Sequence, residues 1–235
     1  MTPKTATDAD TGPPGPGAPA ATPIGLAPGV PLEAAGQDAA KYGSSNPVVV
    51  RLLDRFMGRL KDVIGPIHGT VVDIGIGEGL CLERVLRPVE GAPEVDPRVV
   101  VGIEYRLDKA RAAAQQLPAV EVNVGDAGML PFPERAADLV LCIEVLEHLP
   151  AVEPAVAELA RITGDRCVVS VPWEPWFRLG NLGRGKNVRR LGNDPEHLGA
   201  FSPRSLRRTL ERSFADVRVV PVFPWLVAEA RTPRS

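Results

Sequence analysis

Cysteine, histidine and long apolar runs are all scarce in this sequence. Its 235 residues include only three cysteines and three histidines. An odd number of cysteines without Cys-x-x-Cys spacing argues against a disulfide framework and favours reduced thiols in the core. No apolar run approaches the ~20 residues of a membrane-spanning helix, and residues 1–17 lack the apolar core of a secretory signal. We therefore expect a cytoplasmic protein with no transmembrane segment, for which peripheral membrane contact stays open.

An excess of either charge is also missing. The formal net charge is -2, which gives no general electrostatic reason to expect a nucleic-acid partner. Hydrophobic residues make up 44% and charged residues 24%, close to the average soluble protein, so a packed core can form. The length suits one domain with room for a tail or an insertion. Neither composition nor length indicates an oligomeric state.

The first 40 residues differ in composition from the rest of the chain. They are rich in Pro, Gly and Ala, as in TGPPGPGAPA (residues 11–20). Such a segment cannot bury enough apolar surface to offset the entropy cost of ordering it. We predict a disordered tail over residues 1–40, with a partner-binding segment as the alternative. The folded domain is expected over residues 41–235.

Strands and helices alternate through that domain. Apolar residues at helical spacing predict an amphipathic helix over residues 47–64. Short, nearly all-apolar runs beyond it are typical of strands buried on both faces. Together these segments predict an α/β fold, a doubly wound and mostly parallel sheet covered by helices. The expected strands are 69–75, 98–104, 119–125, 137–144, 165–172, 216–223 and 224–230, and the expected helices are 79–87, 107–117, 151–162 and 202–213.

A glycine-rich segment, VVDIGIGEG (residues 71–79), lies where a predicted strand turns into a predicted helix. There Gly75, Gly77 and Gly79 let the backbone approach a ligand closely and present N–H donors. A dinucleotide fold has the spacing G-x-G-x-x-G, whereas here the third glycine comes one residue earlier. No Gly-Lys-Ser/Thr follows, as a P-loop requires. The spacing argues against NAD and against a P-loop, and a plain turn is the alternative to a ligand site.

Two acidic residues follow later predicted strands. Glu104 ends the second strand, where a carboxylate can accept hydrogen bonds from both hydroxyls of a ribose. Asp126 follows the third strand, where it can accept one from the exocyclic amine of a purine. Ligands of open α/β sheets bind beyond the carboxyl ends of the strands, where the glycine segment also lies. The three features together predict a site for a purine-containing cofactor.

These segments resemble the motifs of the class I S-adenosylmethionine-dependent methyltransferases, especially the group that includes the ubiquinone/menaquinone-biosynthesis type. VVDIGIGEG is similar to the first motif of the family, and VVVGIEYRLDKARAA (99–113) is similar to the second. VGDAGMLPFPERAADLVLCIEVLEHL (124–149) resembles the third and fourth. The sequence departs from the pattern in the Pro-rich loop 88–98, which lengthens the spacing between the glycine segment and Glu104.

The resemblance implies a Rossmann-like methyltransferase fold of seven strands, with an antiparallel last strand that matches the terminal pair of predicted strands. It implies S-adenosyl-L-methionine as cofactor and S-adenosyl-L-homocysteine as product, with no metal ion. Asp73 would anchor the amino end of the methionine moiety, Glu104 the ribose and Asp126 the adenine amine. The remaining residues that it places around the cofactor are Gly75, Gly77, Gly79, Tyr105, Ala127 and Cys142.

A long insertion at about residues 173–201 follows the fifth strand, where this family often builds its acceptor site. Trp173 and Trp176 stand beside Arg178 and further cations, a combination that can hold an amphipathic or anionic acceptor. Lipid-linked, glycosylated and polyketide-like molecules have that character. The alternative is a lid whose aromatic residues pack on the core. Nucleic acid is disfavoured because the fourth strand ends in Cys142-Ile143-Glu144 rather than Asn/Asp-Pro-Pro-Tyr/Phe.

The scarcity of histidine leaves few candidates for a general base. His197, in the insertion, is the first choice, and His148, after the fourth strand, either acts in catalysis or shapes the pocket. His68 precedes the first strand and is expected to be structural. Tyr42 either closes over the bound molecules or makes a core contact at the start of the first helix.

The leading hypothesis is methyl transfer to a small-molecule acceptor, on oxygen first and on carbon next. A non-catalytic protein that binds S-adenosylmethionine and acts as an interaction module would carry the same cofactor motifs. A nucleotide-dependent oxidoreductase is the third possibility, which the glycine spacing disfavours.

Overall fold

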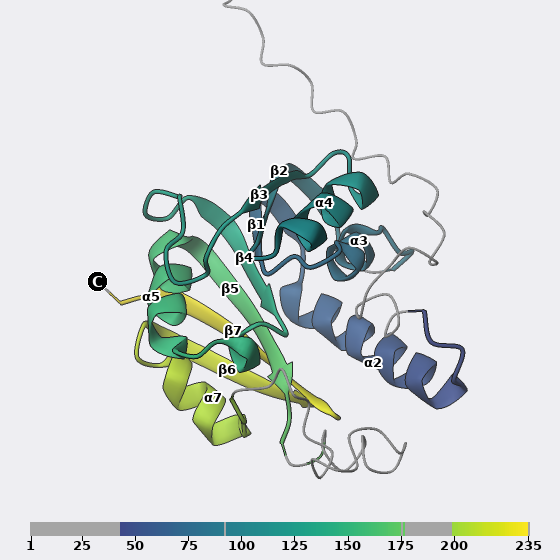
Figure 1. Ribbon diagram of the computed structural model, residues 1–235. Helices are drawn as coiled ribbons and strands as arrows, with labels where there is room; N and C mark the ends of the chain where they lie inside the picture. Colours follow the sequence, from purple (N-terminus) through teal and green to yellow (C-terminus); the bar gives the residue numbers. More distant parts are fainter. Residues whose placement is uncertain (1–42, 92, 175, 177–198, 235) are drawn as a thin grey trace, which may run out of the picture.

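The computed structural model describes residues 43–91, 93–174, 176 and 199–234. The predicted tail and most of the predicted insertion lie outside the described residues. The described part is a seven-stranded sheet with helices on both faces (Figure 1). In chain order its elements are α2 (Pro47–Ile64), β1 (Ile67–Ile74), α3 (Leu80–Leu86), β2 (Val95–Glu104), α4 (Leu107–Gln116), β3 (Glu121–Val124), β4 (Ala137–Ile143), the 3-10 turn η2 (Leu146–His148), α5 (Val152–Ile162), β5 (Thr163–Pro172), α7 (Pro203–Leu210), β6 (Phe214–Val222) and β7 (Trp225–Pro233).

The order of the strands confirms the predicted doubly wound fold. Across the sheet they run β3-β2-β1-β4-β5-β7-β6. The first five are parallel to one another, whereas β7 is antiparallel to both β5 and β6. The chain moves outward in opposite directions from β1 and from β4. The two strands therefore flank the switch point at which open α/β sheets bind their ligands.

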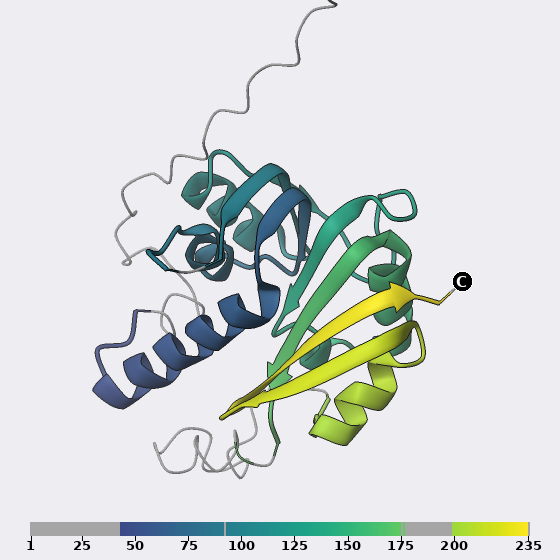
Figure 2. The ribbon, with the colours of Figure 1, turned by 180° about the vertical axis from the view of Figure 1, so that it is seen from behind.

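Apolar side chains cover both faces of the sheet. One core joins the sheet to α5, η2 and α7, and the other joins it to α2, α3 and α4. Figures 1 and 2 show these two helical layers from opposite sides. Burial on both faces explains why the central strands read as continuous apolar runs. No helix in the described part of the chain is long and apolar enough to cross a membrane.

Two helix starts match their sequence signals. The side chain of Asn46 accepts a hydrogen bond from the N–H of Val48 at 2.9 Å, and Pro47 occupies the first turn of α2. Ser202 caps α7 in a reciprocal pair with Ser205, with Pro203 in its first turn. Both caps satisfy N–H groups that have no partner within the helix.

Two sequence expectations at the amino ends of β1 and β2 were wrong. Strand β2 begins at Val95 and not at residue 98, so its start lies inside the predicted loop 88–98. His68 lies within β1, paired with Asp96, and does not precede it. The register shifts at Gly69, opposite Pro97, because proline has no N–H for the ladder. Because the ladder is irregular at this point, β2 can include Pro97, although the prolines of this segment predicted a loop.

Candidate active site

The glycine segment forms a tight turn between β1 and α3. Gly75, Gly77 and Gly79 have φ angles of 73°, 59° and 83°, a region that costs glycine little and other residues more. The N–H groups of Gly75 and Ile76 bond to the carbonyl of Ile103 on β2, at 2.7 and 3.1 Å. A Cβ on Gly75 would lie 2.3 Å from Cγ2 of Val145, so the segment after β4 packs directly against this turn.

Glu104 joins the turn to the end of β2. Its Oε2 accepts a hydrogen bond from the N–H of Gly77 at 2.9 Å, and its Oε1 accepts one from the N–H of Arg106 at 2.9 Å. The side chain is 7% exposed. Its backbone carbonyl accepts a hydrogen bond from Gly125 at 3.0 Å, which brings the end of β3 alongside. The structure thus brings together the glycine turn, Glu104 and the start of the Asp126 segment.

Asp73 is a buried carboxyl group at the end of β1. Burial, and then the charge of Glu104, raise the pKa of Asp73 to about 8. Its neutral form is therefore favoured at neutral pH. A cationic group brought beside it would favour the charged form again, which suits an ammonium ligand.

The residues expected around an adenine lie at the exposed edge of the site. Asp126 is exposed, and its Oδ1 accepts a hydrogen bond from the N–H of Gly128 at 2.8 Å. Tyr105 follows Glu104 directly and is 75% exposed. Ala127 is partly buried and packs on the α5 side of the core. Because Asp126 and Tyr105 are exposed near the glycine turn, a ligand bound there can contact them.

Cys142 lies on β4 with its thiol in the core and not at the surface of the site. Burial is the main cause that raises the pKa of Cys142 well above its ordinary value, followed by the nearby Cys167. Burial likewise raises the pKa of Cys167 to about 12. Both thiols are therefore protonated at neutral pH and are not nucleophiles.

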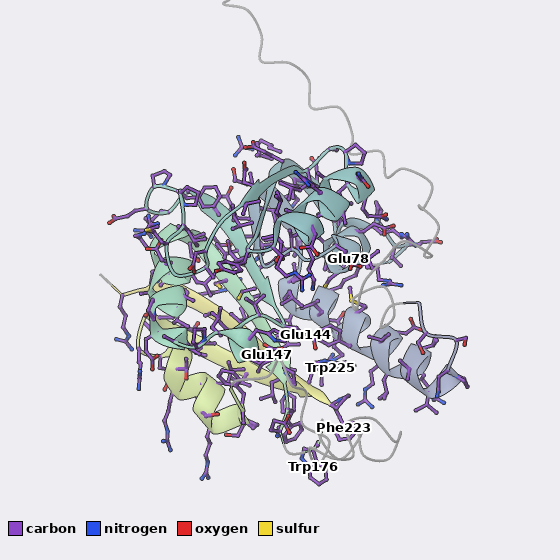
Figure 3. The ribbon with its side chains drawn as sticks, in the orientation of Figure 1. Glu78, Glu144, Glu147, Trp176, Phe223 and Trp225 are labelled. Atoms are coloured by element: carbon purple, nitrogen blue, oxygen red, sulfur yellow. The ribbon has the colours of Figure 1, made fainter. Side chains whose placement is uncertain are left out.

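Sequence reasoning gave no role to the carboxylates that follow β4. Glu144 has a φ of 58°, unusual for a residue other than glycine, and accepts a hydrogen bond from the indole N–H of Trp225. The Trp225 ring packs on Phe56 of α2 with centroids 4.8 Å apart. Glu147 is 1% exposed. Figure 3 shows Glu144, Glu147 and Trp225 close together where the parallel strands end.

A third overlooked carboxylate belongs to the glycine turn itself. Glu78 is 8% exposed, and Figure 3 shows it beside α3, away from Trp176 and Phe223. The signal available in the sequence was position alone, since Glu78 lies in the turn after the first predicted strand and Glu144 ends the fourth. Burial and a positive φ are tertiary facts that no spacing rule predicts.

The predicted acceptor residues are only partly described. Trp173 is half-buried, and its N–H bonds to the carbonyl of Pro224 at 2.9 Å. Trp176 and Phe223 are exposed neighbours with ring centroids 6.3 Å apart (Figure 3). His148 is exposed in η2. The remaining candidates, Tyr42, Arg178 and His197, lie outside the described residues.

These residues fit a nucleoside cofactor that carries an amino acid. Three positions of the turn are positive-φ glycines without side chains, and a Cβ on Gly75 would collide with Val145. A buried carboxyl group, Asp73, lies beside the turn, and an acidic residue, Glu104, ends the next strand. The fold and this set of residues define the class of doubly wound α/β proteins that bind such a cofactor at the carboxyl ends of their strands.

Comparison with known proteins identifies the family within this class. The family model described as "Methyltransferase domain" matches residues 72–168. Residues 72–168 are therefore a methyltransferase domain of the class I S-adenosylmethionine-dependent type, and S-adenosylmethionine is the cofactor of this domain. Membership counts against the oxidoreductase alternative, in agreement with the glycine spacing.

Three similar proteins illustrate the relationship. A demethylmenaquinone methyltransferase of Renibacterium salmoninarum is 28% identical over 144 residues, 59% of this chain and 57% of that protein. An ajmaline N-methyltransferase of Rauvolfia serpentina is 35% identical over 142 residues, 56% of this chain and 46% of that protein. A solved methyltransferase structure from Thermotoga maritima, described as a possible histamine N-methyltransferase, has a TM-score of 0.60 and 18% identity, over 77% of this chain and 89% of that one.

The identity and coverage of these matches limit what can be concluded from them. The structural likeness, at low identity, shows the fold alone. The chain spans about half the length of the curated relatives it matches. The matched segment covers the glycine turn, Glu104, Asp126 and the carboxylates after β4, and it ends before the predicted insertion.

Proposed function

We propose that the protein transfers a methyl group from S-adenosylmethionine to a small-molecule acceptor, on oxygen first and on carbon next. The observation that carries the proposal is the glycine turn held by Glu104 through the N–H of Gly77. This contact puts an acidic residue beside a glycine-rich turn at the switch point of the sheet. Family membership supports the same cofactor.

When bound, S-adenosylmethionine supplies a methyl group that its sulfonium already activates for in-line displacement. The chain then has to bind and orient the methyl donor and the acceptor and to exclude water. Good positioning contributes up to ~7–11 kcal/mol. In our proposal Asp73 holds the ammonium group, Glu104 the ribose and Asp126 the adenine amine. Gly75, Gly77, Gly79, Tyr105 and Ala127 complete the surroundings of the cofactor, and Cys142, whose side chain is buried, supports them from the core.

The acceptor is proposed to bind beyond the ends of β4 and β5, beside Trp173 and Trp176. Exposed aromatic rings at this place suit the apolar part of an amphipathic molecule, such as a lipid-linked, glycosylated or polyketide-like one. Tyr42 and Arg178 are proposed as further acceptor contacts. One relative is named for N-methylation, so a nitrogen acceptor belongs in the same test.

A hydroxyl acceptor has to lose a proton as its oxygen gains the methyl group. We assign that proton to His197 as general base, a role worth roughly 10²–10⁴-fold in rate, with His148 as the second candidate. His197→Ala should lower turnover and leave cofactor affinity unchanged. Unchanged turnover would remove His197 from the mechanism.

Calorimetric titration of S-adenosylmethionine, S-adenosylhomocysteine and NADH into the purified protein tests the cofactor assignment. We expect the two sulfur compounds to bind and NADH not to bind. Glu104→Ala and Asp126→Ala should each weaken binding by about tenfold or more, because each removes a hydrogen bond to the ligand. Glu121→Ala is the matched control, since Glu121 is an exposed carboxylate at the opposite end of β3.

Two other outcomes would change the proposal. If neither sulfur compound binds, the methyltransferase assignment fails for this chain. If both bind but no methyl transfer occurs across oxygen, carbon and nitrogen acceptors, the non-catalytic interaction protein becomes the better description.

A further inference from the structure

The segment between β3 and β4, residues 125–136, begins at the predicted adenine contact. Within it, the carboxylate and the carbonyl of Asp126 accept hydrogen bonds from Gly128 and Met129, at 2.8 and 3.0 Å. These bonds shape the first turn but do not attach it to another element. Leu130 is buried and packs on the core that α5 shares with the sheet. On its other side Asp126 follows Gly125, whose N–H bonds to the carbonyl of Glu104, so its position depends on that anchor and on what holds the residues just after it.

Helix α5 supplies polar contacts to those residues. Oε2 of Glu158 accepts a hydrogen bond from the N–H of Leu130 at 2.7 Å. The guanidinium of Arg161 donates to the carbonyl of Phe132 at 2.6 Å and to that of Leu130 at 3.0 Å. The carbonyl of Arg161 in turn accepts a hydrogen bond from the N–H of Arg135 at 2.8 Å. One turn of α5 thus binds both backbone groups of Leu130.

The two side chains also hold each other in a fixed geometry. Nε and Nη2 of Arg161 meet the two carboxylate oxygens of Glu158 at 2.6 and 2.7 Å. The side chains are 28% and 18% exposed, so solvent weakens the pair less than it weakens an open surface pair. This two-pronged contact needs the planar guanidinium, and lysine cannot reproduce it.

Both members are charged under ordinary conditions. Hydrogen bonding by Arg161 is the main cause that holds the pKa of Glu158 below its ordinary value. The same contact raises the pKa of Arg161. The carboxylate accepts from Leu130 in its charged form, which makes that hydrogen bond stronger than a neutral one.

We propose that Glu158 and Arg161 are positioning residues for the adenine of the cofactor, acting through the backbone of Leu130 and Phe132 on Asp126. The inference rests on the proposed function, since it takes Asp126 as the adenine contact. Neither side chain is required to touch the cofactor. Loosening the pair lets Asp126 move away from the exocyclic amine, so that its contribution to binding is lost.

A double-mutant cycle on binding of S-adenosylhomocysteine to the full chain tests this coupling. We expect Glu158→Gln to weaken binding by about tenfold. In the Asp126→Ala background the same substitution should cost almost nothing further, because the contact that it positions is already gone. Arg161→Lys is the second variant and should behave alike. Glu153→Gln is the matched control, since Glu153 is on the same helix in an exposed ion pair with Arg212 at 2.7 Å and does not hold the segment.

Two readouts separate positioning from a general loss of structure. A probe whose adenine amine is replaced by a carbonyl, S-inosylhomocysteine, should bind the wild-type protein about tenfold more weakly than S-adenosylhomocysteine, and Glu158→Gln should erase that preference. Amide hydrogen exchange at Leu130 should be faster in Glu158→Gln, with or without ligand. Three results would each overturn the inference. The first is that Glu158→Gln weakens binding as much in the Asp126→Ala background as in the wild-type protein. The second is that Glu158→Gln still prefers S-adenosylhomocysteine to S-inosylhomocysteine, and the third is that amide exchange at Leu130 is unchanged. Absence of any binding by the wild-type protein would instead overturn the proposed function.

Discussion

Asp73 is 4% exposed near the end of β1, and its carboxyl group is close enough to Glu104 to feel its charge. Its pKa rises from 3.8 to about 8 because burial and the neighbouring charge both disfavour the ionised form. Between these two values the unfolded chain loses the proton while the folded chain keeps it. The contribution of Asp73 to the free energy of unfolding is therefore complete below about pH 4 and is lost as the pH rises to about 8.

Asp73→Asn removes this titration with little change in shape. We expect the stability of the wild-type protein, relative to the variant, to fall by up to about 1.4 kcal/mol per pH unit between about pH 4 and pH 8. Urea unfolding of both proteins at several pH values across that window measures the difference. If the free energies of unfolding of the two proteins change with pH in the same way, Asp73 is ionised throughout this window and its pKa is not raised.

At the scale of elements, Trp225 links three segments that are distant in the sequence. Its ring packs on Phe56 of α2, and its indole N–H bonds to Glu144 after β4. Trp225 itself begins β7, opposite Pro172 at the end of β5. This connection attaches α2 and the start of β7 to the segment that follows β4.

A double-mutant cycle with Trp225→Phe and Glu144→Gln measures the link between these elements. Phenylalanine keeps an aromatic ring against Phe56 and removes the N–H. We expect a coupling free energy of about 1.5–3 kcal/mol in urea unfolding, the range for hydrogen bonds to charged groups. Because the cycle subtracts the packing cost of each single change, it serves as its own control. Losses that simply add would mean that the hydrogen bond contributes nothing to stability.

At the scale of the whole molecule, the proposed cofactor site is assembled from β1, β2, β3 and the segment after β4. Binding there should stabilise the folded protein as a unit, since the unfolded chain has no such site. At 100 times the dissociation constant the gain is about 2.7 kcal/mol. For a domain of this size that corresponds to a rise in Tm of about 5–10 °C.

Thermal unfolding with and without S-adenosylhomocysteine measures this effect, and NADH at the same concentration is the control. A saturating concentration that leaves Tm unchanged, or an equal rise with NADH, would contradict a specific site. The concentration is set from the dissociation constant that calorimetry gives.

The sequence predicted the order and type of the elements well because each carries a local signal. Helix α2 has the predicted bounds, with Pro47 at its start and Gly65 after its end. The parallel strands are apolar along their length because both faces are covered. The prediction failed where strand pairing overrode a local loop signal. Val95 and Pro97 pair with β1, although the prolines of this segment predicted a loop. The Asp126 role and the acceptor residues stay predictions.

What the sequence determined by itself is the fold class, the family and the glycine turn, because periodicity, turn chemistry and motif spacing lie within short stretches of chain. Only the tertiary structure decided that Glu104 closes the turn through Gly77, that Asp73 carries a raised pKa, and that Trp225 meets Glu144. Likewise, only the fold brings α5 to the Asp126 segment. These properties depend on burial and on contacts between residues far apart in the chain, and sequence spacing carries no information about either.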